Sequence, residues 1–515
     1  MAASHLKLDT LPEHGTSRII SASSIQINMV QTPKAFYRHG WQSWSLTAWT
    51  DPDHVLPRMK PTSLQSRQTD PVYARDRHPN GSWLGAVELA SDDILFLGAL
   101  SLEAHVALRD GQLQGWYETG SGDWCVARGS ELDVFARYVA LLGERFGVAQ
   151  HRPPPRVWCS WYGLYDRISE ENLLEALEGL GDLPFDVFQV DDGWQRGPGD
   201  WEPNDKFGSG MDALAAQIKA TGRKAGLWLA PLVAGRGSSI QRQHPDWLLR
   251  NPDGDLYVAG FEWSDQTFAL DTTHPEVIEW LRDLIHKVRG WGYDYLKLDF
   301  LSAGALPGKR YHDLPREAAY RQALEVIRDA AGDAYLLLCG TPILPSLGLC
   351  DAIRIGADVG NWWDSWFYSY LFYNQTAPGV KNAIRTSVNR LWLAPLVNLD
   401  PDVAFFSKYK SLTPEQMRLF RDLTHVCGVK ATSDFPDTWS VSLKAQVRRW
   451  LESSPAVTRT ARYTFMIDGR SVDFSPAIPL PPIPRYLDAA LGEILGWLGN
   501  QVWALRLWHW LLRYD

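Results

Sequence analysis

Two charged residues near the end of an apolar run give the first chemical signal in this sequence. Lys297 and Asp299 interrupt the stretch from Tyr293 to Phe300, whose other members suit a buried strand. Residues two apart on a strand point to the same side, so the ammonium and the carboxylate are expected to project together. A buried ion pair is costly unless other groups satisfy it. The pattern therefore predicts either an internal salt bridge or an enzyme that keeps its chemistry at the ends of strands.

Polar and aromatic residues also end other apolar runs of the chain. Carboxylates accept hydrogen bonds from hydroxyl groups, and indole rings can cover the apolar face of a sugar. Crowded carboxylates raise one another's pKa, whereas nearby cations lower it, and this separation lets one carboxyl act as an acid and another as a nucleophile. The mixture suits a polyhydroxylated neutral ligand. The predicted strand-end residues are Trp161, Asp191 with Asp192, Trp228, Lys297 with Asp299, Cys339, and Arg354 with Asp358.

A divalent cation is the competing ligand for this acidic group. Asp191, Asp192 and Asp299 are residue types that hold Mg²⁺ or Ca²⁺. Lys297 and Arg354 would repel a cation and no histidine joins the set, so we expect neither a metal nor a cofactor. The adjacent aspartates also fit a simple turn before a glycine, since neighbouring strand residues point to opposite faces. Sensitivity to EDTA would reveal a Mg²⁺-dependent barrel enzyme.

Alternating strand and helix patterns from Arg156 to Ser433 must position these residues. Such repeats imply a parallel sheet, and we expect an α/β fold with a closed (β/α)8 TIM barrel. An open doubly wound sheet is the alternative, although no Gly-rich phosphate loop follows the first strand. The expected strands are Val157–Tyr162, Val187–Val190, Ala225–Ala230, Tyr295–Phe300, Tyr335–Cys339 and Ala352–Gly356, with two less distinct ones near Leu391–Asp402 and Val426–Ser433. The expected helices between them are Asn172–Leu180, Met211–Ala220, His274–Arg289 and Glu317–Ala331.

The first part of the chain has a different pattern. Short alternating runs, such as Ser24–Val30, predict an N-terminal β-sandwich domain over residues 1–150. Its aromatic loop, Gly40–Ser45, is typical of a binding loop, and Trp41 is the candidate binding residue in it. The alternative is that the loop indoles belong to the sandwich core, which we consider the better interpretation for Trp44.

The last part of the chain departs from both patterns. We expect the catalytic barrel to span residues 151–435 and a divergent, partly helical C-terminal region to span 436–515. Its strand signal is limited to Arg462–Ile467, and a Pro-rich stretch follows. The Trp-rich tail from Tyr486 to Asp515 is expected to be a helix packed on the barrel, with a membrane-surface helix or an oligomer contact as alternatives.

Composition narrows the classes of function. The 515 residues include 25 Trp and are 45% hydrophobic, which indicates a globular chain and favours carbohydrate binding. The net charge of −9 argues against a nucleic-acid partner. Five scattered cysteines suggest neither a disulfide framework nor a zinc site. We find no signal-peptide pattern and no long apolar run, so we expect a cytoplasmic protein without a membrane partner.

Several motifs, in order along the chain, are similar to those of glycoside hydrolase family 36, the melibiase-like α-galactosidases. The resemblance extends from about Tyr37 to Ser433. Any one of the motifs is a weak signal, but their order and their spacing along a barrel make the set specific. The motifs are Gly40–Ser45, Trp158–Tyr162, Phe188–Trp194, Tyr295–Asp299 and Arg354–Asp358.

This resemblance implies a retaining hydrolysis in two steps. By motif position, Asp299 resembles the nucleophile and Asp358 resembles the general acid and base. The carboxyl groups of a retaining pair lie about 5–5.5 Å apart. Asp299 should stay ionised beside Lys297, whereas Asp358 must be protonated at rest against the pull of a nearby guanidinium. The residues that resemble sugar-binding groups or aromatic walls are Asp191, Asp192, Lys297, Arg354, Cys339, Trp161, Trp228 and, from the N-terminal domain, Trp41.

The sequence thus predicts a retaining exo-α-galactosidase that acts on terminal α-galactosyl residues of oligosaccharides such as melibiose and raffinose. The alternatives on the same site are a raffinose synthase-like transglycosylase and an α-N-acetylgalactosaminidase. A non-catalytic sugar-binding protein is less consistent with two opposed carboxylates. Asn398–Asp402 resembles an acidic strand-end motif of related barrels, and we assign it no catalytic role. The sequence is compatible with both a monomer and a homo-oligomer.

Overall fold

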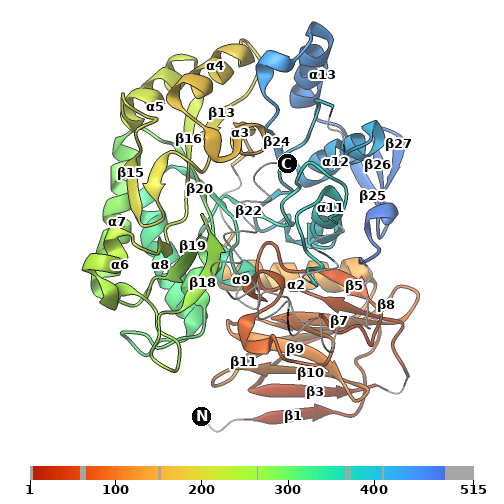
Figure 1. Cartoon of the computed structure of the whole chain (residues 1–515). Coiled ribbons are helices and arrows are strands. Elements are labelled where there is room, and N and C mark those ends of the chain that lie inside the picture. The colour runs from red at the N-terminus through yellow and green to blue at the C-terminus, as the bar shows by residue number, and fades with distance from the viewer. Residues whose placement is uncertain are drawn as a thin grey trace.

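A computed structural model shows a β-rich N-terminal domain below a barrel, with smaller C-terminal elements at the barrel's side (Figure 1). It describes residues 4–29, 31–57, 65–148, 152–263, 265–365, 369, 373–408, 411–481 and 494. None of the helices in this described part combines the length and the apolar character that crossing a bilayer requires.

Two sheets face each other in the N-terminal domain, as predicted for a β-sandwich. The first has the order β1 (His5–Leu8), β3 (Ser24–Asn28), β10 (Gln112–Tyr117), β9 (Ala104–Arg109) and β6 (Asn80–Ser82). The second has the order β2 (Thr16–Ala22), β11 (Gly122–Gly129), β8 (Asp93–Ala99), β7 (Leu84–Ala90), β4 (Ala35–Arg38) and β5 (Ala48–Thr50). The sheets meet closely where Gly115 faces Trp124, since a Cβ at Gly115 would lie 2.7 Å from the indole.

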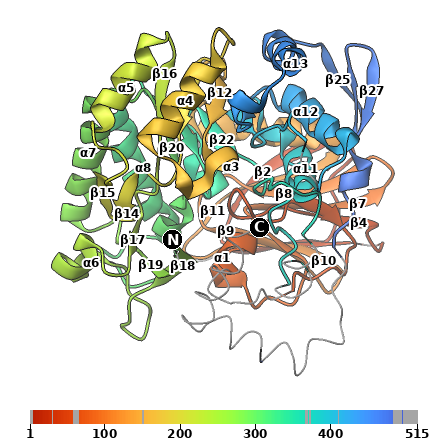
Figure 2. The same ribbon diagram turned by 45° about the horizontal axis from the view of Figure 1, so that its top comes forward.

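Eight parallel strands form the predicted barrel, and they follow one another around it in chain order. They are β12 (Arg156–Cys159), β13 (Val187–Val190), β16 (Lys224–Leu229), β20 (Tyr295–Leu298), β21 (Tyr335–Leu338), β22 (Ala352–Arg354), β23 (Asn398–Asp400) and β24 (Lys430–Thr432). The last two strands meet through a parallel bridge between Leu399 and Gly428, which brings the barrel close to full closure. The strands are almost entirely buried because helices cover them from outside (Figure 2).

Helices form the outer layer around the barrel strands. They are α4 (Glu170–Leu180), α5 (Met211–Ala220), α7 (Pro275–Gly290), α8 (Arg316–Ala331), α11 (Val380–Val388) and α12 (Pro414–Cys427). Ser169 and Asn172 form a capping box on α4, and Thr413 and Gln416 form one on α12. Such reciprocal bonds satisfy backbone N–H groups that have no partner inside the helix.

One insertion between β16 and α7 was not predicted. It forms a three-stranded antiparallel sheet from β17 (Val233–Gly235), β19 (Asp265–Ala269) and β18 (Val258–Glu262). The turn between β18 and β19 carries Trp263, whose φ of 52° lies in the left-handed region.

A buried network joins the N-terminal domain to the start of α8. The carboxylate of Glu317 accepts hydrogen bonds from the indole N–H groups of Trp41 (3.2 Å) and Trp83 (2.9 Å), and from the backbone N–H of Glu103 (2.6 Å). The preceding residue, Arg316, pairs with Asp70 at 2.6 Å and also with Glu118. The two domains therefore share a polar interface that is largely shielded from water.

The C-terminal region has more strand structure than the sequence suggested. Helix α13 (Val441–Glu452) precedes an antiparallel sheet of β25 (Val457–Ala461), β26 (Thr464–Ile467) and β27 (Arg470–Asp473). The strand predicted within Arg462–Ile467 is present as β26. The sequence missed β25 and β27, because these strands are short, largely exposed and lack an apolar run. The Trp-rich tail lies outside the described residues apart from Ile494. The exact domain limits at 150 and 435 stay predictions.

Candidate active site

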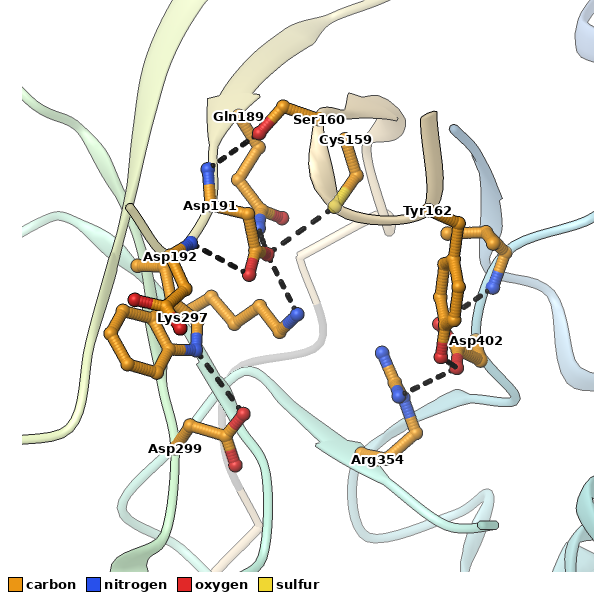
Figure 3. A network of polar contacts seen from close by, with 12 residues as sticks. Cys159, Ser160, Tyr162, Gln189, Asp191, Asp192, Lys297, Asp299, Arg354 and Asp402 are labelled. Atoms are coloured by element: carbon orange, nitrogen blue, oxygen red, sulfur yellow. Dashed lines mark hydrogen bonds and ion pairs between the residues drawn. The ribbon is translucent and has the colours of Figure 1, made fainter. Parts of the chain in front are cut away.

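The carboxyl ends of the barrel strands bring most of the predicted site residues together. Parallel strands of a barrel end on one face, so residues far apart in the sequence meet there. The close-up shows two polar clusters, one around Asp191 and Lys297 and the other around Arg354 and Asp402 (Figure 3).

Asp191, just after β13, lies at the centre of the first cluster. Its Oδ2 accepts hydrogen bonds from Lys297 Nζ at 2.8 Å, from Gln189 Nε2 at 2.5 Å and from the Cys159 thiol at 3.3 Å. Burial alone would lower the pKa of Lys297, but the Asp191 carboxylate raises that pKa well above its usual value. Lys297 is therefore a cation held by Asp191, and not by Asp299 as we expected.

Asp192 is held by two neutral donors. Gln195 Nε2 donates to its Oδ1 at 2.6 Å, and Trp263 Nε1 donates to its Oδ2 at 2.8 Å. Loss of hydration on burial raises the pKa of Asp192 to about 6, with a further contribution from the neighbouring Asp191. We did not predict Trp263 from the sequence. The sequence feature that could have identified it is a pair of short strand-like runs on either side of a polar turn.

Asp299 directly follows β20 and is fixed by N–H groups. Trp228 Nε1 donates to Oδ2 at 3.2 Å, and the backbone N–H of Phe300 donates to Oδ1 at 2.8 Å. Phe300 adopts a φ of 53°, a left-handed conformation that is uncommon for an aromatic residue. Burial raises the pKa of Asp299, while Lys297 and the Trp228 hydrogen bond oppose this effect. Backbone and indole donors thus orient this carboxylate.

Arg354, at the end of β22, is surrounded by carboxylates. Its Nε contacts Asp400 Oδ2 at 2.8 Å, and its Nη1 contacts Asp402 Oδ2 at 3.0 Å and Asp358 Oδ1 at 3.3 Å. Asp402 also accepts a hydrogen bond from the Tyr162 hydroxyl at 2.6 Å. Most of the charge of Arg354 is therefore neutralised by the pair Asp400 and Asp402, which the sequence had marked only as an acidic motif.

Asp358 keeps 40% of its side chain exposed, although protein groups crowd its carboxyl group. This crowding removes hydration and raises the pKa of Asp358, the negative charge of Asp299 adds to the effect, and Arg354 and Lys297 oppose it. A raised pKa agrees with our expectation that Asp358 is protonated in the resting enzyme. The contribution of Asp299 to this pKa indicates that the two carboxyl groups are close enough to interact electrostatically.

The other predicted site residues occupy different places around the strand ends. Trp161 is half-buried at the start of α3 (Trp161–Leu164), with its ring 5.3 Å from that of Tyr165. Trp228 is buried inside β16. Cys339 is buried after β21, and burial raises the pKa of its thiol well above the usual value, so it is a neutral group.

The N-terminal loop presents a different indole from the one we predicted. Trp41 has no exposed surface, and its N–H bonds to Glu317 in the domain interface. Trp44 instead lies against Phe300, with ring centres 5.4 Å apart, and against Gly340, where an added Cβ would be 2.8 Å from the indole. Because Phe300 and Gly340 follow β20 and β21, Trp44 is the loop residue placed at the strand ends. The buried position of Trp41 does not support the role we predicted for it. The sequence could not separate the two indoles, because they share one loop and differ only in partners that are distant in the chain.

The sequence of this chain matches the Melibiase family over residues 136–329. Its fold is similar to that of TtGalA, an α-galactosidase from Thermus thermophilus, solved in complex with p-nitrophenyl α-D-galactopyranoside. That match has 42% identity and a TM-score of 0.85, and it covers 91% of this chain and 96% of the other. The same protein in complex with stachyose matches with 43% identity and a TM-score of 0.79, over 84% of this chain and 93% of the other.

A more distant relative is the α-galactosidase AgaA of Geobacillus stearothermophilus. The sequences are 28% identical over 197 residues, which make up 35% of this chain and 26% of AgaA. The chain thus aligns with about a quarter of the length of this curated relative. The crystal structure of AgaA, a GH36 α-galactosidase, shares the fold with a TM-score of 0.59 at 14% identity, over 86% of this chain and 66% of the other.

Proposed function

Because this chain belongs to the melibiase family, the α-galactosidases of glycoside hydrolase family 36, we propose that it is a retaining exo-α-galactosidase. It would remove terminal α-galactosyl residues from oligosaccharides such as melibiose and raffinose. The proposal is supported by the positions of Asp299 after β20 and Asp358 in the segment that follows β22, where the charge of Asp299 raises the pKa of Asp358. Each of the two has its own set of polar partners.

In the first step, the carboxylate of Asp299 attacks the anomeric carbon while Asp358 gives its proton to the departing oxygen. The N–H groups of Trp228 and Phe300 support this role, because they aim the attacking carboxylate before the substrate arrives. The raised pKa of Asp358 supports its role as the acid.

In the second step, water attacks the glycosyl-enzyme and Asp358 takes its proton. Once Asp299 is esterified, its negative charge no longer raises the pKa of Asp358, so that pKa falls. The same residue can then act as the base. The steps need only these carboxylates and water.

Asp191, Asp192 and Lys297 are proposed to hold the galactose hydroxyl groups. Each carboxylate has lone pairs beyond those used by its protein partners, and the Lys297 ammonium has further N–H donors. Trp228 and Trp44 are proposed as aromatic walls. The p-nitrophenyl galactoside and stachyose bound to TtGalA support a galactosyl ligand of this kind.

The test is hydrolysis of p-nitrophenyl α-D-galactoside with EDTA present, with the product followed by NMR. We expect α-galactose to be released first and Asp299→Asn to abolish this release. Asp358→Asn should lose about 10²–10⁴-fold in kcat/KM on raffinose, whose leaving sugar needs a proton. Asp294→Asn is the matched control, because Asp294 precedes the same strand at its other end and binds Lys219 and Arg289 there. Early release of β-galactose, or full activity of the Asp299 variant, would refute the mechanism. Adding sucrose or galactose as acceptors separates hydrolysis from transfer.

A further inference from the structure

A buried arginine with an unusual set of partners holds the loop that carries Trp44. Arg390 follows α11 and has no exposed surface. Its Nη2 donates to the carbonyls of Gly40 (3.0 Å), Gln42 (2.8 Å) and Ser45 (3.3 Å), and its Nη1 donates to that of Ser43 (2.5 Å). Within the described part of the chain, no carboxylate bonds to this guanidinium. These four partners are backbone oxygens of one short loop.

The same guanidinium also reaches the barrel. Nη1 donates to the carbonyl of Ile355 at 3.1 Å, directly after Arg354 and three residues before Asp358. One rigid planar group is thus bonded both to the loop from the N-terminal domain and to the segment that leads to Asp358. Guanidinium groups suit this use because their donors have fixed directions.

The position of Trp44 depends on this loop. Its indole packs on Phe300 and over Gly340, whose φ of 52° and close approach leave no room for a side chain. We propose that Arg390 is a positioning residue, which places Trp44 at the strand ends and fixes its place relative to the segment that carries Asp358. The kinetic part of this inference rests on the proposed function.

Arg385 offers a matched comparison five residues earlier. It is equally buried, and it bonds to the carbonyls of Ile478 (2.7 Å) and Pro479 (2.6 Å) and to the side chain of Asn382. Replacing Arg390 leaves buried carbonyl groups without donors, and replacing Arg385 does the same to partly buried ones, so both changes should destabilise the fold. Only the change at Arg390 should displace Trp44.

The first experiment is a double-mutant cycle on the full-length protein, with p-nitrophenyl α-D-galactoside as substrate. We expect Arg390→Met to raise KM about tenfold or more relative to Arg385→Met, since small displacements of substrate-positioning groups have effects of this order. The Arg390→Met change should add less than about twofold when Trp44→Leu is already present. Equal KM values for the two arginine variants, or effects that multiply in the double variant, would overturn the proposal.

A second experiment is independent of catalysis. The protein is labelled with 5-fluorotryptophan, and the Trp44 signal is identified by its absence from Trp44→Leu. We expect this ¹⁹F signal to shift or broaden in Arg390→Met and to stay in place in Arg385→Met. An unchanged signal in Arg390→Met would contradict the proposal even in an active enzyme. Inactive wild-type protein with the expected signal change would refute the proposed function alone. Arg390→Lys, which keeps the charge but loses the planar fork, replaces Arg390→Met if that variant does not fold.

Discussion

At the scale of single residues, the central feature is how the charge of Arg354 is divided. Asp400 and Asp402 contact it at 2.8 and 3.0 Å, whereas Asp358 contacts it at 3.3 Å. An unshared guanidinium would hold a neighbouring carboxyl in its ionised form. The two buried aspartates weaken this effect, so a protonated Asp358 beside an arginine becomes compatible with acid catalysis.

The first prediction concerns Asp402→Asn. This change removes a negative charge near Asp358 and leaves more of the Arg354 charge unbalanced, and both effects lower the pKa of Asp358. Because the acid must be protonated, the alkaline limb of the kcat/KM profile should move to lower pH by about one unit. The control is Asp422→Asn, which disrupts another buried carboxylate, bound to Arg470 away from the strand ends. A limb that stays in place or moves upward would contradict this account.

The sequence identified the charged strand-end residues but not their pairing. Lys297 and Asp299 are two residues apart, which suggested a mutual ion pair, yet Asp191 from the neighbouring part of the barrel lies closer to the ammonium. Trp41 and Trp44 lie in one loop, where no helix or strand periodicity predicts the direction of either side chain. Glu317, 276 residues away from Trp41, determines which indole is withdrawn from the site, and no local pattern carries that information.

At the scale of elements, the hairpin of β18 and β19 brings a residue to the site from an insertion. Its turn residue, Trp263, donates to Asp192 and has its ring 5.5 Å from that of Phe300. The hairpin therefore contributes a residue to the same candidate active site as the barrel strands.

The second prediction is that Trp263→Phe weakens binding while it preserves the aromatic ring. Asp192 loses a donor that stabilises its charged form, so its pKa rises further above about 6. Since a hydroxyl-binding carboxylate must be ionised, the acid limb of kcat/KM should move to higher pH, with about a tenfold loss at neutral pH. Trp247→Phe removes a comparable indole bond, to Glu276 at 2.9 Å, elsewhere in the same insertion. A similar change in both variants would show that the effect is not specific to Asp192.

The barrel elements were largely predictable because each is long enough to show its own pattern. Helix α5 has the predicted limits, and α4, α7 and α8 begin or end within two residues of theirs. The strands of the inserted sheet and of the C-terminal sheet are short and partly exposed, so their residues do not alternate clearly between apolar and polar.

At the scale of the whole molecule, the N-terminal domain and the barrel share a buried hydrogen-bond network around Glu317. Three N–H donors from the N-terminal domain converge on one carboxylate of α8. We therefore expect the two domains to unfold together rather than in separate steps.

The third prediction tests this coupling with Glu317→Ala. Each buried donor left without a partner costs about 1–3 kcal/mol, so the free energy of unfolding should fall by at least about 3 kcal/mol. Urea unfolding followed by fluorescence and by circular dichroism measures the loss. Glu325→Ala, on the exposed side of the same helix, should change it by less than about 1 kcal/mol because its ion pair with Arg321 is open to water. A second, separate transition in the wild-type protein would contradict the expected cooperativity.

The loop held by Arg390 also has a consequence for the time course of synthesis. Gly40 and Arg390 are 350 positions apart, so at about 5–20 residues per second the ribosome adds the arginine roughly 20–70 s after the loop. Until then, the loop carbonyls that Arg390 will bind lack the donors of its guanidinium. The N-terminal domain can form its sheets early on the ribosome, but the segment that brings Trp44 to the strand ends receives the Arg390 contacts only when about three quarters of the 515-residue chain has been made.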